Sequence, residues 1–187
     1  MIDDLFIYHV PGDPIKCLES LESTSPYHIN KLRGSVPFSL IQKCARASVR
    51  NLEITRMEGR KYLVPRLLTQ PSLESTKVWH LHLEWCTDLG VGFARKYMEL
   101  DANIRSSLNF GSMSRDTIGD FIERMGDLRI VDRTEVLVRF ETNNPEKHMI
   151  MKRFERGEYS REHRFVMVVV SAEIQKSQYD EYVFNRL

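Results

Sequence analysis

The sequence predicts an α+β fold, a mainly antiparallel sheet of five or six strands with two or three helices packed on one side. Residues 163–175 contain a continuous apolar run, residues 77–86 and 134–142 alternate apolar and polar side chains, and the segment after Ser114 has helical spacing. The chain has 187 residues, 42% of them hydrophobic and 28% charged, as in an ordinary globular protein. We assign residues 1–35 to a partly ordered N-terminal arm and residues 36–187 to a single domain with a docked C-terminal segment.

Residues 1–35 are assigned to an arm because they mix a short apolar stretch with turn-rich segments. Over residues 38–50, Phe38, Ile41 and Cys44 recur at helical spacing and predict a helix with a basic stripe on another face. In "NLEITRMEGRKYLVPRLL", residues 51–68, two β-compatible runs flank Gly59 and predict a hairpin. Pro65 places the second run at an edge or a bulge.

The middle of the chain predicts a second hairpin and then a helix. Residues 77–86 form the best strand, and "VGFARKYMEL", residues 91–100, is expected to pair with it. From Ser114, which is placed to cap, the apolar residues follow the helical period as far as Gly126, which is placed to end the helix. We then expect a half-buried strand over residues 134–142 and a central strand over 165–170. No internal repeat is apparent.

Three features of the sequence predict an intracellular protein of the cytoplasm or nucleus. The three cysteines are an odd number and far apart, which argues against a disulfide framework. The first ten residues carry two acids where a secretory signal would carry positive charge. The longest apolar run, "FVMVVV", is far shorter than the ~20 residues of a membrane-spanning helix. We therefore expect a protein that is neither secreted nor integral to a membrane.

The segment "VWHLHLEWC", residues 78–86, offers a candidate metal site. Because side chains alternate along a strand, the tryptophans share one face with the leucines, and His80, His82 and Glu84 share the other. Imidazole and carboxylate are competent zinc ligands. Zinc is therefore one candidate cofactor, although no other short-spaced histidine pair supplies a second group of ligands. The alternative is a polar sheet face with its core on the tryptophan side, and in that case there is no cofactor.

Basic residues form two clusters that predict contact with nucleic acid or an anionic membrane surface, because arginine suits phosphate and nearby aromatic rings can stack on bases. The alternative is a solvated face that balances acids elsewhere. The candidate residues are Lys43, Arg46, Arg50, Arg56, Arg60, Lys61, Arg66, Lys152, Arg153 and Arg156.

The C-terminal segment "KSQYDEYVFNRL" is too apolar for a free tail and is expected to dock on its own body or on a neighbouring copy. Sheet proteins must pair or cover their strand edges, and self-association is one way to do so. We therefore expect a homo-oligomer, with Tyr179, Tyr182 and Phe184 as candidate self-association residues.

These patterns predict a non-enzymatic, self-associating binding or assembly protein, a profile shared by small viral matrix and accessory proteins. RNA or an anionic membrane surface is the expected partner. The sequence has no nucleophile motif, phosphate-binding loop or dinucleotide fingerprint, and it identifies no catalytic residue and no small-molecule substrate. Two alternatives remain: a metal-dependent enzyme using His80, His82 and Glu84, and a module that binds another protein through its docked terminal segments.

Overall fold

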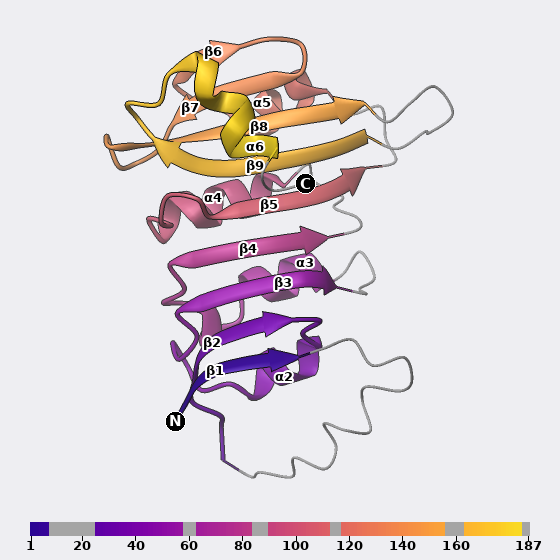
Figure 1. The fold of residues 1–187 in the computed structure, drawn as a ribbon, viewed down its shortest axis with the longest axis vertical. Helices are drawn as coiled ribbons and strands as arrows, with labels where there is room; N and C mark the ends of the chain where they lie inside the picture. The colour runs from indigo at the N-terminus through magenta and orange to yellow at the C-terminus, as the bar shows by residue number, and fades with distance from the viewer. Residues whose placement is uncertain (8–24, 58–62, 84–89, 113–116, 156–162, 185–187) are drawn as a thin grey trace.

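The fold is built on one nine-stranded mixed sheet (Figure 1). The computed structural model describes residues 1–7, 25–57, 63–83, 90–112, 117–155 and 163–184. The spatial order of the strands is β1-β2-β3-β4-β5-β9-β8-β7-β6. Strands β1 to β5 run parallel to one another, and β9, β8, β7 and β6 continue the sheet with antiparallel pairing. The strands are β1 (Ile2–Ile7), β2 (Ile29–Gly34), β3 (Asn51–Met57), β4 (Val78–Leu83), β5 (Ser107–Ser112), β6 (Ile130–Arg133), β7 (Leu137–Glu141), β8 (Lys147–Glu155) and β9 (His163–Ser171).

Short helices cover both faces of this sheet. Figure 1 shows α2, α3, α4 and α5 behind it and α6 in front. No helix in the described segments is both long and apolar enough to cross a membrane. We call the side with four helices the helix-layer face and the other side the α6 face. The helices are α2 (Phe38–Lys43), α3 (Leu63–Leu68), α4 (Val91–Glu99), α5 (Ile118–Met125) and α6 (Tyr179–Phe184), with short 3-10 helices η1 (Pro71–Leu73) and η2 (Lys176–Gln178).

The predicted fold class is wrong. The sheet has nine strands instead of five or six, half of it is parallel, and five helices lie on two sides instead of two or three on one. Segments α2, α3 and α4 each connect two neighbouring parallel strands, which a hairpin cannot do. Residues 2–7 and 29–34, within the predicted arm, form the first two strands of the sheet.

Both predicted hairpins are crossovers. The run after Gly59 forms α3, where Pro65 lies in the first turn, a position at which proline costs a helix no hydrogen bond. The segment after β4 forms α4, which begins after Gly90 with φ 71°. A side chain at Gly90 would contact the rings and methyl groups of Phe110 and Leu108 at 3.1–3.3 Å. Glycine therefore allows α4 to begin directly against β5.

Five other elements were predicted with partial success. The described part of the 77–86 strand is confirmed as β4, the 134–142 strand as β7, and the apolar run lies in β9. The helix after Ser114 is confirmed as α5 and ends at Gly126, but its cap is Thr117, whose hydroxyl accepts from the Asp120 amide at 3.1 Å. The 38–50 helix ends at Lys43, because a turn with Ala47 at φ 53° follows it.

The core lies between the helix-layer face and its helices, and it is built from equivalent positions in successive strands. Leu52 pairs with Trp79 across β3 and β4, and Leu81 pairs with Leu108 across β4 and β5. All four side chains are at most 3% exposed. The β-strand and helix units that precede β5 thus repeat a common arrangement.

Strand β9 joins the two halves of the sheet. It pairs with β5 on one side and with β8 on the other, and Phe165 to Val170 are at most 2% exposed. Phe165 stacks on Phe110 of β5 with ring centroids 5.3 Å apart. A strand covered on both faces in this way is apolar at every position.

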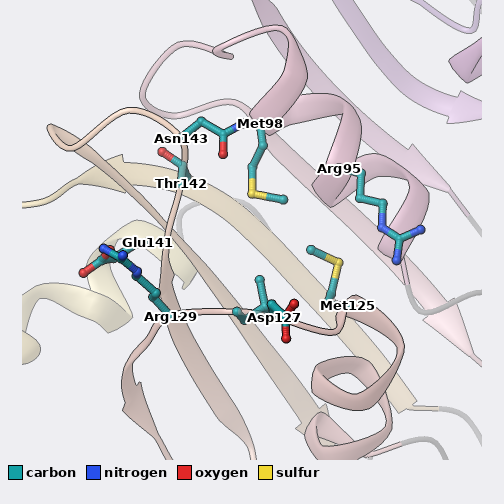
Figure 2. A pocket seen from close by; sticks show the side chains of 9 residues that line it. Arg95, Met98, Met125, Asp127, Arg129, Glu141, Thr142 and Asn143 are labelled. Atoms are coloured by element: carbon teal, nitrogen blue, oxygen red, sulfur yellow. The ribbon is translucent and has the colours of Figure 1, made fainter.

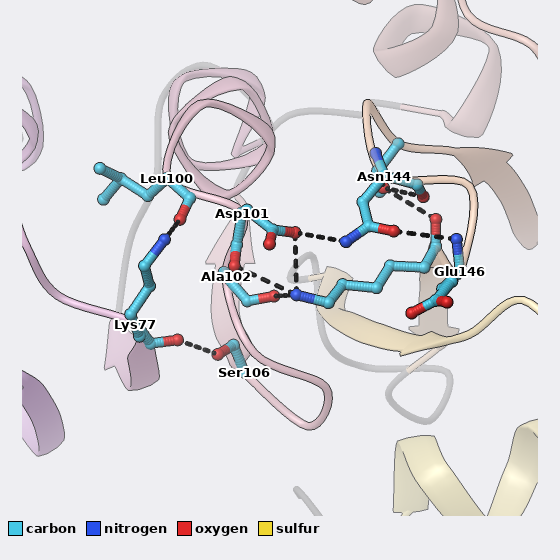
Figure 3. Close-up of polar contacts among 9 residues, drawn as sticks. Lys77, Leu100, Asp101, Ala102, Ser106, Asn144 and Glu146 are labelled. Carbon is cyan, nitrogen blue, oxygen red and sulfur yellow. Dashed lines mark hydrogen bonds and ion pairs between the residues drawn. The ribbon is translucent and has the colours of Figure 1, made fainter.

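Lys147, at the start of β8, ties the turn after α4 to the antiparallel half. Figure 3 shows that turn, with Leu100, Asp101 and Ala102, facing Asn144 and Glu146. Its Nζ lies 2.8 Å from Asp101 Oδ1 and 3.2 Å from the carbonyl oxygens of Asp101 and Ala102. Lys77 donates to the Leu100 carbonyl in the same turn, so two cations satisfy the C-terminal end of α4. The hydrogen bond from Lys147 lowers the pKa of the Asp101 carboxyl.

We predict that Lys147→Met lowers the free energy of unfolding by about 2 kcal/mol, because three carbonyl and carboxylate acceptors lose a charged donor that is 15% exposed. Urea unfolding measures the change. Lys176→Met is the control: this lysine is 70% exposed in its pair with Asp132, and its loss should cost about 0.5 kcal/mol or less. An equal loss of unfolding free energy in the two variants would contradict the role of Lys147 in holding the turn after α4.

Candidate functional site

The α6 face of the parallel half carries a polar surface. Arg33, Glu53, His80 and Ser107 stand in one cross-strand row from β2 to β5. Among the described elements, no helix lies over β1 to β4 on this side (Figure 1). We call the surface the polar strand face, and its side chains are those of Asp4, Phe6, Lys31, Arg33, Asn51, Glu53, Thr55, His80 and His82.

The predicted alternation of "VWHLHLEWC" is confirmed for its described residues, Val78–Leu83. Trp79 and the two leucines of β4 are at most 3% exposed on the helix-layer face, and the Trp79 indole N–H donates to the Thr76 carbonyl at 3.0 Å. His80 and His82 lie half-buried on the opposite side. The core is therefore on the tryptophan side.

The described part of the chain brings no third metal ligand to these histidines. His80 Nδ1 lies 3.2 Å from the Ser107 hydroxyl. In the described segments, no group of three or more His, Cys, Asp or Glu side chains is arranged to hold a metal ion. Glu84, the third predicted ligand, lies outside the described residues. Zinc binding at His80 and His82 stays a prediction.

Charges on the polar strand face compensate one another. Arg33 makes two contacts with the Asp4 carboxylate, at 3.1 Å from Nε and 2.5 Å from Nη2. Lys31 approaches the same carboxylate at 3.9 Å. The Arg33 guanidinium also lies 5.5 Å from the centre of the Phe6 ring, which is 43% exposed. The surface offers an aromatic ring, hydrogen-bonding groups and charges of both signs.

The first predicted basic cluster is only partly described. Lys43, Arg46 and Arg50 are exposed near the end of α2 and the start of β3, and Arg46 Nε pairs with Glu74 at 2.8 Å. Arg66, on α3, lies 4.7 Å from the centre of the Phe38 ring. The side chain of Arg56 and the residues Arg60 and Lys61 lie outside the described residues.

The second basic cluster divides between the two faces of β8. Lys152 faces α6, where its Nζ pairs with Asp180 at 2.5 Å, and it is 17% exposed. Arg153 lies on the opposite face beside Phe165 of β9 and is half-buried. Arg156 lies outside the described residues. The described members of the two clusters thus do not form one continuous basic surface.

The C-terminal segment docks on its own sheet. Tyr179 and Val183 of α6 pack on an apolar group of β7, β8 and β9 side chains that includes Ile150 and Val168. Tyr179 is 5% exposed, whereas Tyr182 is partly buried at the edge of this group. The side chain of Phe184 is not described. Self-association through these residues stays a prediction.

Arg139 of β7, 5% exposed, fixes this docking. Its Nη1 donates to the Ile174 carbonyl and to the Tyr179 hydroxyl, both at 2.8 Å, and its Nη2 donates to the Ala172 carbonyl at 2.6 Å. Its Nε donates to His148 Nδ1 at 2.9 Å. The half-buried strand that the sequence predicts over residues 134–142 has Arg139 on its polar side, whereas the structure buries this side chain. The apolar Leu137 on the same side was the signal that this side is covered.

We predict that Tyr179→Phe lowers the free energy of unfolding by about 1–2 kcal/mol, because it removes an acceptor from a buried guanidinium and keeps the ring. Tyr182→Phe is the matched control, because no hydrogen bond of its hydroxyl is found in the described structure, and its cost should be near zero. Chemical unfolding and sedimentation measure stability and subunit number together. A Tyr179→Phe protein of full stability and altered subunit number would favour self-association instead.

His148 makes the stability of this region dependent on pH. Burial and then the charge of Arg139 lower the pKa of His148, and the nearby Glu141 carboxylate opposes the shift. The folded protein therefore binds this proton less tightly than the unfolded chain, and the free energy of unfolding should fall as pH drops below about 6.5. His148→Gln keeps an acceptor for Arg139 and removes the titration. Urea unfolding between about pH 5 and 7.5 should show a shallower slope for this variant, and an unchanged slope would exclude His148 as the cause.

Cys44 does not provide a nucleophile. Its thiol is buried beneath α2 and lies 3.3 Å from the Leu40 carbonyl oxygen, to which it donates. Burial raises the pKa of Cys44 to about 11, so the thiol stays protonated at neutral pH. Cys17 and Cys86 lie outside the described residues.

Comparison of the chain with protein-family models, with curated proteins and with solved structures returned no match.

Proposed function

We propose that this protein is a non-enzymatic binding module that recognises another protein across the polar strand face. One observation carries the proposal: successive parallel strands present a continuous polar surface on the side opposite their crossover helices. Proteins that stack β-strand and helix units use such extended surfaces to bind partners. The sequence left open a module that binds another protein through its docked terminal segments, and the proposal keeps that class of function but places the binding surface on the polar strand face.

The composition of this surface favours a protein partner. Phe6 and Arg33 are of residue types that are enriched at protein interfaces, and the half-buried histidines add hydrogen-bonding groups. Lys31 and Arg33 are compensated by Asp4, and Glu53 adds a further negative charge to the same surface. Phosphate recognition needs uncompensated positive charge, which this surface does not supply.

The described basic residues outside the face are also poorly arranged for RNA. Arg46 pairs with Glu74, Lys152 pairs with Asp180 beneath α6, and Arg153 faces the opposite side of the sheet. A nucleic-acid groove needs cations aligned along one surface. These placements favour protein binding over the RNA or membrane contact that the basic clusters predicted.

Site-specific photo-cross-linking tests the proposal. Thr55 is an exposed residue of the polar strand face on β3. A photoreactive phenylalanine analogue placed there therefore reaches a bound partner without disturbing the core. We expect a discrete protein adduct in extract of the source cells, because the partner covers this surface. The adduct should be lost in the Lys31→Glu, Glu53→Lys double variant, which reverses two charges of the face and leaves the net charge unchanged.

Glu123 provides the matched control position. It is exposed on α5, on the helix-layer face, and the same analogue there should not give the Thr55 adduct. Nuclease-sensitive adducts at Thr55 would contradict the proposal in favour of nucleic acid. The same adduct from both positions, or none from Thr55, would also reject the polar strand face as the binding surface.

A further inference from the structure

A pocket of about 370 Å³ opens on the helix-layer face where the two halves of the sheet meet. It lies between α4, the end of α5 and the turn after β7 (Figure 2). Its volume falls within the range of about 300–1,000 Å³ that small-molecule pockets occupy, so it has room for one aromatic side chain. It is on the opposite side of the sheet from the polar strand face, so it is a separate site.

Two methionines supply the apolar part of this pocket. Met98 comes from α4 and Met125 from the end of α5, and Figure 2 shows their side chains pointing toward one another across the space. Met125 is 9% exposed, and Met98 and Leu128 are partly buried against the core. Flexible, polarisable thioethers make favourable contacts with aromatic rings and adapt to their shape.

The polar groups stand around this apolar part. Arg95 is held at one side, where its Nη2 donates to the Arg124 carbonyl at 3.0 Å. Arg129 and Glu141 stand together at the opposite side, with Nη1 and Oε2 3.5 Å apart. In the part of the chain that the structure describes, the Asp127 carboxylate has neither an ion pair nor a hydrogen-bond donor. It is therefore an available acceptor beside an apolar surface.

We propose that this pocket binds the side chain of a tryptophan or tyrosine from a partner protein. The ring packs against Met98 and Met125, and its N–H or O–H donates to the Asp127 carboxylate. Tryptophan and tyrosine combine an apolar body with one donor, which is the combination that this pocket complements. Such aromatic side chains are frequent anchors of protein interfaces.

Methionine-methyl NMR tests the site with N-acetyl-L-tryptophanamide as the probe. Ring currents should shift the methyl signals of Met98 and Met125 in a saturable way, with a dissociation constant on the order of millimolar. Met149 and Met151, both 0% exposed in the core, are internal references that should not move. N-acetyl-L-leucinamide, which has neither ring nor side-chain donor, should bind at least about tenfold more weakly.

Two charge-matched variants separate the acceptor from a general electrostatic effect. Asp127→Ala should weaken binding of the probe about three- to tenfold. Glu123→Ala removes the same charge from α5 outside the pocket and should leave the affinity unchanged. Both positions are exposed, so both variants should keep the melting temperature of the parent protein.

Three results of the probe experiments would overturn the inference. They are unmoved Met98 and Met125 signals at about 10 mM probe, an equal response to the leucine amide, and equal weakening of binding by the two variants.

A fourth result concerns the partner. If the same signals moved with protein concentration alone, the occupant would be a second copy of this chain, which would overturn the assignment to a different partner. The result is independent of cross-linking at Thr55, because the two surfaces lie on opposite faces of the sheet.

Discussion

The position of β9 between β5 and β8 is the constraint on which the rest of the structure depends. This strand pairs along its whole length with β8 and along β5 on its other side, and its central residues are buried on both faces. A strand that is apolar on both faces requires cover on both. Helices α4 and α5 lie on one side of this region, and α6 supplies cover on the other side (Figure 1).

The same constraint divides the α6 face into two surfaces. Around β9, the side chains of Val166, Val168 and Ile150 point to the α6 face. Helix α6 packs on them and so removes them from solvent. Across β5 the row continues as Ser107, His80 and Glu53, which need no apolar cover. The boundary between covered core and polar strand face thus falls at the β5–β9 pair, where parallel pairing changes to antiparallel. Arg139 then fixes α6 through carbonyl and hydroxyl acceptors on the segment that follows β9.

The sequence correctly predicted the elements whose apolar pattern covers six or more residues and whose start and end signals lie nearby in the chain. The helix from Ile118 to Met125 has a cap and a terminating glycine within a few residues, and the run from Phe165 to Val170 is unmistakably buried. Helix α3 has six residues, fewer than two turns, so its apolar spacing fits a strand or a helix equally well. The hairpin predictions failed at α3 and α4 because a glycine between two apolar runs cannot distinguish a hairpin from the start of a crossover.

The repeated arrangement of β3, β4 and β5 escaped detection for a related reason. Leu52 and Ile54 of β3 pair with Trp79 and Leu81 of β4, and Leu81 and Leu83 pair with Leu108 and Phe110 of β5. These apolar pairs are nevertheless separated by unequal intervals in the sequence and connected by dissimilar helices. Few residues recur, so the sequence shows no self-similarity, and only the register of the parallel strands reveals the unit. The polar side of "VWHLHLEWC" could be identified from alternation alone, but its neighbours Arg33 and Glu53 could not, since they come from strands that the sequence did not indicate as partners.

Both candidate binding surfaces therefore arise from pairings that are distant in the sequence. The polar strand face exists because parallel register places Arg33, Glu53 and His80 in one row. The methionine pocket exists because α4 belongs to the parallel half and α5 packs on β8 of the antiparallel half, so the space between Met98 and Met125 depends on how the halves join. Lys147 fixes that junction by binding the turn after α4 from the start of β8 (Figure 3). The sheet therefore sets the distance between α4 and α5, and the two flexible methionines adapt to an occupant within that space.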